Sequence, residues 1–107
     1  MKKLTLLFAI LAMGVAQAQW EQGGTLHKST LSQWNISSDE NRLATCADFA
    51  ATVWKEEIMS KGKGWEKELL IRSYYLMTCV DEVAEERSLG YMKVAEVASA
   101  CTILYNN

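Results

Sequence analysis

The sequence predicts an all-α protein: a small three-helix bundle built on a disulfide-stapled antiparallel helical hairpin, with a flexible N-terminal arm. Apolar residues recur at helical spacing over residues 38–60, 65–87 and 88–105. No proline interrupts these segments, and Gly62-Lys63-Gly64 marks a bend between the first two. The predicted organisation is therefore a leader (1–18), an arm (19–37) and a helical domain (38–107).

Residues 1–18 have the three parts of a secretory signal peptide. Lys2 and Lys3 form a basic head, an apolar run extends from Leu4 to Val15, and Ala16-Gln17-Ala18 is a small-x-small cleavage site. The apolar run is shorter than the roughly 20 residues that a membrane-spanning helix needs. We expect cleavage after Ala18, no integral membrane segment in the mature chain, and a periplasmic or secreted protein.

The charge of the chain narrows the classes of partner, and its cysteine content predicts a disulfide. Without Lys2 and Lys3, nine basic residues remain against thirteen acidic ones. Nucleic acids and anionic lipid surfaces require a basic field, so neither is expected as a partner. A small exported domain commonly needs a covalent staple, and three cysteines in an oxidising compartment fit one disulfide with one thiol left over.

The arm, residues 19–37, contains Trp20 and Trp34 among polar residues and has no sustained period of 2 or 3.6. We expect a flexible segment from which Leu31, Trp34 and Ile36 pack back on the helices. Two interpretations remain open at this point. The arm either grasps a partner or is a poorly ordered chain terminus.

The first helix is expected to begin at Ser37, which can form a capping box with Glu40. It should end at the bend, because glycine disfavours continued helix and adopts left-handed turns at low cost. Helical spacing places one set of apolar residues on a common face. These are Leu43, Cys46, Ala50, Val53 and Trp54.

The second helix opens at Trp65 and is apolar on two faces, which is typical of the central helix of a bundle. Its acidic cluster of Asp81, Glu82, Glu85 and Glu86 is interpreted as a solvated helix face rather than a cation site. A third helix, capped by Ser88, should then run to about Tyr105, antiparallel to the second. Its expected apolar face contains Val94, Val97, Ala98, Cys101, Leu104 and Tyr105.

The cysteine positions suggest where the staple lies. Cys46 and Cys79 are equally far from the bend, so an antiparallel pair of helices would bring both sulfurs to one level. We therefore predict a Cys46–Cys79 disulfide. Cys101 is the alternative partner of Cys79, because it falls about two residues from the same level in the third helix.

No catalytic constellation accompanies this scaffold. The single histidine, His27, lies in the arm and is remote in sequence from every cysteine, which disfavours a nucleophile–histidine relay. The chain has no Cys-x-x-Cys pair, and three scattered cysteines make a poor zinc site. The expectation is a protein that is not an enzyme and needs no cofactor or metal.

By elimination, we expect the protein to act by binding another protein. Aromatic residues are frequent interface anchors, although in a small domain they can equally fill the core. The partner-binding candidates are Trp20, Trp34, Trp54, Trp65, Tyr74 and Tyr75.

Three short motifs add a family resemblance. Thr45-Cys46-Ala47-Asp48-Phe49, Trp54-Lys55-Glu56-Glu57 and Val97-Ala98-Ser99-Ala100-Cys101-Thr102 resemble the HdeA/HdeB group of small periplasmic acid-stress chaperones. The resemblance implies a small all-helical fold, a homodimer and a disulfide between Cys46 and Cys101. It also implies that acid loosens the dimer and exposes apolar surface to unfolded client proteins. The chain departs from the group in having Cys79 and in lacking proline.

A second hypothesis belongs to a different functional class. A dedicated inhibitor, such as an immunity protein or a phage-encoded lysis or superinfection regulator, would bind one envelope protein tightly at neutral pH. A single stoichiometric partner at pH 7 would favour the inhibitor, and client protection only in acid would favour the chaperone.

Overall fold

The computed structural model describes residues 19–106, and the predicted signal peptide at 1–18 lies outside them. Among the described residues the fold is all-α, as predicted, with five α-helices, no β-strand and one isolated bridge between Thr30 and Lys93. The elements are α2 (Leu31–Asn35), α3 (Asp39–Val53), α4 (Lys55–Met59), η2 (Gly62–Gly64), α5 (Trp65–Ala84), η3 (Arg87–Leu89) and α6 (Val94–Asn106).

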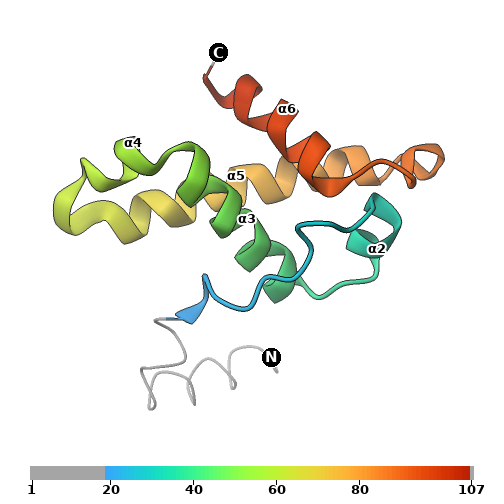
Figure 1. The fold of residues 1–107 in the computed structure, drawn as a ribbon, viewed down its shortest axis with the longest axis horizontal. Helices are drawn as coiled ribbons and strands as arrows, with labels where there is room; N and C mark the ends of the chain where they lie inside the picture. The colour runs from blue at the N-terminus through green and yellow to red at the C-terminus, as the bar shows by residue number, and fades with distance from the viewer. Residues whose placement is uncertain (1–18, 107) are drawn as a thin grey trace, which may run out of the picture.

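Helices α3 and α5 form the predicted hairpin: they run in opposite senses and pack against each other at an oblique crossing (Figure 1). Gly62 makes the bend in the left-handed region, at φ +57°, where a residue with a side chain is strained. At the far end of the hairpin, Arg42 of α3 lies 3.8 Å from Asp81 of α5. The buried face of α5 consists of Leu69, Ser73, Leu76, Val80 and Ala84.

The expected single helix over residues 38–60 is broken at Trp54. This residue leaves helical geometry at φ −113° and ψ 32°, yet Trp54 N–H still donates to Ala50 O and Ile58 N–H to Trp54 O. Ala50, Trp54 and Ile58 are all buried. In a straight helix, side chains spaced four residues apart move progressively around the helix axis. The break at Trp54 offsets this rotation and so keeps all three side chains in the core.

The ends of two helices also differ from expectation. Ser38, not Ser37, caps α3 by accepting from Asn41 N–H. Helix α6 begins at Val94 rather than at Ser88, because the intervening backbone pairs with the N-terminal segment. Leu31 N–H donates to Met92 O at 2.8 Å, and Val94 N–H donates to Ser29 O at 2.9 Å.

The predicted arm, residues 19–37, is packed on the bundle rather than free of it. Leu26, Leu31 and Trp34 are buried, which confirms the expected packing of Leu31 and Trp34. Ile36 instead is 87% exposed, so the prediction that it packs back is wrong. The segment forms α2, whose capping box pairs Thr30 with Gln33.

The disulfide joins Cys79 of α5 to Cys101 of α6, and Cys46 is a buried free thiol. The predicted Cys46–Cys79 bond is therefore wrong, as is the Cys46–Cys101 bond that the family resemblance implied. The alternative pairing of Cys79 with Cys101 is confirmed. The reason is angular: Val80 is on the buried face of α5, and its neighbour Cys79 is turned about 100° from it, towards α6.

Helix α5 is accordingly the middle helix, with one face on α3 and another on α6. Two contacts define the second face: the Cys79–Cys101 bond and the Tyr75–Tyr105 ring pair, with centroids 4.8 Å apart. Because residue numbers rise along α5 as they fall along α6 between these contacts, the two helices are antiparallel, as expected. The disulfide therefore joins α5 to α6 and not α3 to α5.

Candidate functional site

Two of the six aromatic candidates belong to the core. Trp34 is fully buried, and its Nε1–H donates to Asp81 Oδ1 at 2.8 Å. Trp54 is 1% exposed. Neither indole is accessible to a partner in this fold, so the prediction that they bind one is corrected. The hydrogen bond also shows that Asp81 is not simply part of a solvated acidic face.

The other four candidates are distributed over the surface. Trp20 is half-buried near the start of α3, where it lines a cavity with Leu43. Tyr75 is half-buried against Tyr105. Trp65 and Tyr74 are exposed on α5. The structure therefore leaves Trp65 and Tyr74 as the accessible anchors and does not bring the six residues together.

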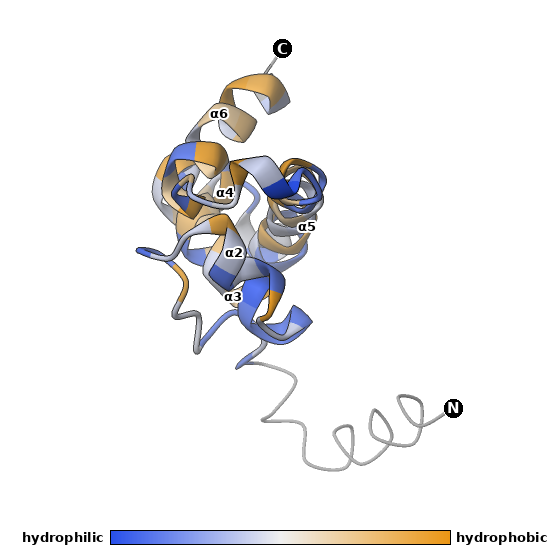
Figure 2. Cartoon of the chain, turned by 90° about the vertical axis from the view of Figure 1, so that its right-hand side faces the viewer, coloured by the Kyte–Doolittle hydropathy of each residue, from blue (hydrophilic) through white to orange (hydrophobic). Residues whose placement is uncertain are grey.

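Exposed large apolar side chains, Ile36 and Tyr91 among them, occur over the described surface, and five of them lie on α4, on α6 or at the adjoining ends of α3 and α5. Helices α4 and α6 lie on the upper side in both views, and α6 is largely apolar, whereas α2 and the start of α3 are hydrophilic (Figure 2). We call the exposed residues of this region the apolar end. They are Val53, Met59, Trp65, Ile103 and Leu104, each at least 41% exposed.

Two hollows flank the last part of α3 at the apolar end. The α4–α5 pocket has a volume of about 230 Å³ and is lined by Ala51, Lys55, Ile58, Met59, Trp65 and Leu69. The α3–α6 groove is smaller, at about 80 Å³, and is lined by Phe49, Val53, Ala95, Ala98, Ser99 and Thr102. The walls of both are mainly apolar, so each is suited to an apolar side chain rather than to a polar ligand.

Helix α6 is unusual in composition. Glu96 is its only charged residue, and the outward side of its last turns presents Ile103 and Leu104. Leu104 was predicted on the buried face, and this is wrong. A helix that is apolar on nearly all sides is normally covered on all sides, so this composition is the signal by which the sequence could have identified the surface.

Behind the apolar end, the guanidinium of Arg72 lies against two aromatic rings that also contact each other. Its guanidinium carbon lies 5.0 Å from the centroid of the Trp54 ring and 4.9 Å from that of Tyr105. Its Nε–H donates to Glu68 at 2.7 Å. This arrangement satisfies the charge within the protein, and it fixes the end of α6 against the break between α3 and α4.

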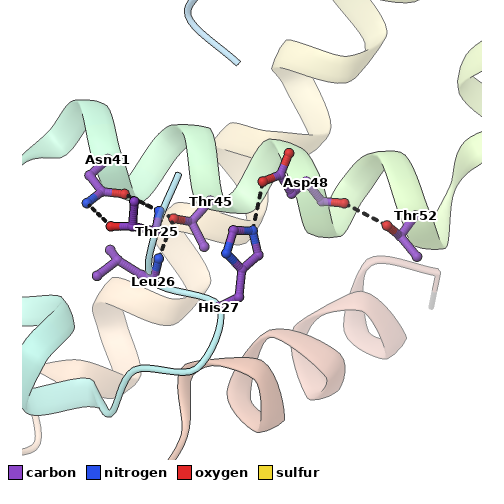
Figure 3. Close-up of polar contacts among 7 residues, drawn as sticks. All are labelled: Thr25, Leu26, His27, Asn41, Thr45, Asp48 and Thr52. Carbon is purple, nitrogen blue, oxygen red and sulfur yellow. Dashed lines mark hydrogen bonds and ion pairs between the residues drawn. The ribbon is translucent and has the colours of Figure 1, made fainter. Parts of the chain in front are cut away.

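The N-terminal segment is fastened to α3 by a series of polar contacts at one-turn spacing (Figure 3). The pairs are Thr25 with Asn41, Leu26 with Thr45, and His27 with Asp48. Gly24 approaches the α3 backbone so closely that a Cβ there would lie 2.5 Å from Thr45 N. The segment therefore rests directly on the helix backbone.

His27, expected to be remote from other functional groups, lies beside a carboxylate. Its Nε2 is 2.7 Å from Asp48 Oδ2, and its ring meets Phe49 edge-on. Within residues 19–106 no hydroxyl or thiol is hydrogen-bonded to this histidine, and no group of three or more His, Cys, Asp or Glu residues is arranged to hold a metal. The contacts of His27 thus attach the N-terminal segment to α3.

Burial also determines the chemistry of the free cysteine. Desolvation, with the nearby charge of Asp81, raises the pKa of the Cys46 thiol from 9.0 to about 12. The thiol therefore stays protonated at physiological pH. A protonated, buried thiol is a poor nucleophile, so Cys46 acts as a small core residue.

No family model matches the chain, and neither does any curated protein or solved structure. In the part of the chain that the structure describes, none of the helices combines the length and the apolar character required to cross a membrane.

Proposed function

We propose that this chain is an exported protein that acts by non-catalytic binding of another protein through its apolar end. The observation that carries the proposal is the exposure of Val53, Met59, Trp65, Ile103 and Leu104, of which the first three line two apolar hollows. Clustered exposed apolar surface of this kind is typical of interaction sites. The disulfide supports the exported location, because such bonds persist in oxidising compartments.

The favoured mode is binding of one folded envelope protein at neutral pH, as a dedicated inhibitor would do. The apolar end is exposed in the folded chain itself, so binding needs no acid-induced opening. Tyr105 and the Cys79–Cys101 bond hold α6 in place. A pre-positioned surface loses less conformational entropy when it binds than one that must first become ordered.

Acid-stress chaperone activity is the second candidate, and a separate observation favours it. The N-terminal segment is joined to α3 partly by the Asp48–His27 contact, and Arg42 is paired with Asp39 and Asp81. At pH 2 to 3 the chain as a whole loses negative charge and becomes strongly positive and self-repelling. Loosening the segment would then enlarge the apolar surface that is available to unfolded clients.

The test is affinity capture from an envelope extract at pH 7, with the exported protein immobilised. Ile103→Asp places a charge in the apolar end, and Ile36→Asp is its matched control, because Ile36 is an exposed isoleucine at the opposite, hydrophilic end. We expect one stoichiometric partner that is lost with Ile103→Asp and kept with Ile36→Asp. Equal capture by both variants would contradict the proposed surface.

A parallel assay addresses the chaperone mode. The protein is mixed with an acid-denatured client at pH 2 to 3, and client aggregation is followed by light scattering. Protection only in acid, with no partner at pH 7, would replace the favoured mode by the chaperone. If neither capture nor protection occurs, the proposal of protein binding fails. Gel filtration at pH 7 shows whether the bound partner is a second copy of the chain.

A further inference from the structure

We propose that the α4–α5 pocket receives one apolar side chain from an acidic segment of the partner protein, while a carboxylate of that segment binds Lys55. This inference rests on the proposed protein-binding function and adds the chemistry of the partner. Three features of the pocket support it: its volume, its charge and its surroundings.

The volume of the pocket suits a single side chain. At about 230 Å³ it exceeds the ~150 Å³ of an engineered protein cavity that accepts benzene. It is smaller than the roughly 300–1,000 Å³ of sites for cofactors and drug-sized molecules. Buried Ile58 and Leu69 form part of its wall. A leucine or phenylalanine side chain would fill the space and remove apolar surface from water.

The charge of the pocket selects an acidic neighbour for that side chain. Lys55 is the only charged residue in the lining, and within the described chain no carboxylate lies close enough to pair with its Nζ. Helical spacing turns the adjacent Glu56 and Glu57 away from the side of α4 that carries Lys55, Ile58 and Met59. Lys55 is exposed, so its charge is free to pair with a carboxylate of the partner. A single exposed pair of this kind adds up to about 1 kcal/mol.

The local charge balance agrees with this assignment. Residues 55–67 contain four lysines and three glutamates, whereas residues 19–107 as a whole contain nine basic and thirteen acidic residues. The hairpin bend is thus slightly basic in an acidic protein. Complementary charge of this kind favours encounter with an acidic partner and disfavours a basic one.

The surroundings favour a polypeptide over a small acid. Met59 is 64% exposed, and Trp65 stands at the same rim. Methionine and tryptophan are effective contact residues at protein interfaces. A small carboxylic acid inside the pocket would leave most of both side chains in water, whereas a peptide chain crossing the rim would cover them.

The test uses methyl NMR of the exported protein labelled at its methionines. Met59 reports on the pocket, and Met92, which is not part of its lining, is the internal control. The probe is the blocked peptide Glu-Glu-Leu-Phe-Glu-Glu. Two comparison peptides replace either its four glutamates by lysines or its Leu-Phe pair by Ser-Ser, and phenylpropionate represents small acids.

We expect the acidic apolar peptide alone to shift the Met59 methyl resonance while Met92 stays unchanged. Lys55→Glu should weaken this binding about tenfold or more, and Ala51→Phe, which fills the pocket from an exposed position, should abolish it. Lys28→Glu, an exposed lysine outside the pocket, should have no effect. If Ala51→Phe fails to fold, Lys55→Glu still decides the result.

Three outcomes would overturn the inference: an unmoved Met59 resonance, equal binding of the acidic and basic peptides, or tighter binding of phenylpropionate than of the peptide. Its failure is distinguishable from failure of the proposed function. If Ile103→Asp removes partner capture but Lys55→Glu does not, the function stands and the pocket assignment falls. If no partner and no client is bound, the function falls even where the peptide binds.

Discussion

The rings of Trp54 and Tyr105 lie 4.9 Å apart, so the end of α6 is attached to the break between α3 and α4. Tyr105 also contacts Tyr75 and the guanidinium of Arg72. These contacts connect the end of α3, the middle helix α5 and the end of α6 at one point. The exposed residues Ile103 and Leu104 of the apolar end are positioned by this attachment, which therefore determines the shape of the proposed binding surface.

The first prediction concerns this attachment. Tyr105→Ala should lower the free energy of unfolding by about 2 to 3 kcal/mol, because it removes two ring contacts and the aromatic face over Arg72. Urea denaturation measures the change. Tyr91→Ala is the control, since Tyr91 is 75% exposed and its loss should have little effect. Equal effects of the two substitutions would contradict the role given to Tyr105.

The second prediction compares two contacts of the N-terminal segment. Thr45→Val keeps the side-chain shape but leaves the buried Leu26 N–H without its acceptor, which should cost about 1 to 3 kcal/mol. His27→Ala removes a half-exposed contact with Asp48 and should cost no more than about 1 kcal/mol. Denaturant unfolding ranks the two, and hydrogen exchange at the Leu26 amide should rise with Thr45→Val. The reverse ranking would show that the histidine, not the threonine, holds the segment.

The third prediction concerns the covalent staple. Cleavage without reduction should release one linked peptide pair that contains Cys79 and Cys101, with Cys46 in an unlinked peptide. Because the bond closes a loop with a separation of 22 residues, replacing both bonded cysteines by alanine should cost about 3 kcal/mol. A linked peptide containing Cys46 would refute the pairing, and Cys46→Ala should leave the bond intact.

The fourth prediction follows from the raised pKa of the Cys46 thiol. In the unfolded chain the thiol loses its proton near pH 9.0, whereas in the folded protein it does so near 12. Between these values the folded state binds more protons, so stability should fall as the pH rises, with a slope approaching about 1.4 kcal/mol per pH unit. Below pH 9 the Cys46 thiol should add no pH dependence to the stability.

Cys46→Ala provides the control for that experiment, because it removes the thiol and keeps every other titrating group. The stability of wild-type protein should fall faster than that of the variant between pH 9 and 12, as measured by urea denaturation. Parallel curves would refute the assignment. A thiol reagent at pH 8 should accordingly modify Cys46 only after denaturant is added.

Much of the fold could be predicted because helical periodicity and helix-breaking glycines are local properties of a sequence. The hairpin, the bend at Gly62, the two-sided apolar character of α5 and the packing of Leu31 and Trp34 all follow from spacing and residue type. The α6 start at Val94 could not be predicted in this way. It depends on backbone pairing with residues 29–32, which are remote in sequence.

The candidate site was less predictable than the fold. Aromatic content indicated interface anchors, but an indole is equally suited to a core, and Trp34 and Trp54 are core residues. Lys55, Met59, Ile103 and Leu104 were not identified, because each fits an ordinary helix surface or stripe when considered alone. Only the near absence of charge in α6 pointed to an uncovered apolar helix.

Composition and spacing were thus sufficient to establish a helical chain, an antiparallel hairpin and a central second helix, since each depends on neighbours along the chain. Tertiary packing alone decided which cysteines are bonded and which aromatic rings are buried. The physical reason is that two residues at the same height along neighbouring helices need not face each other. Each step of one residue turns the side chain by about 100° around the helix axis. On α5 that single step directs Val80 to the buried face against α3 and Cys79 to α6.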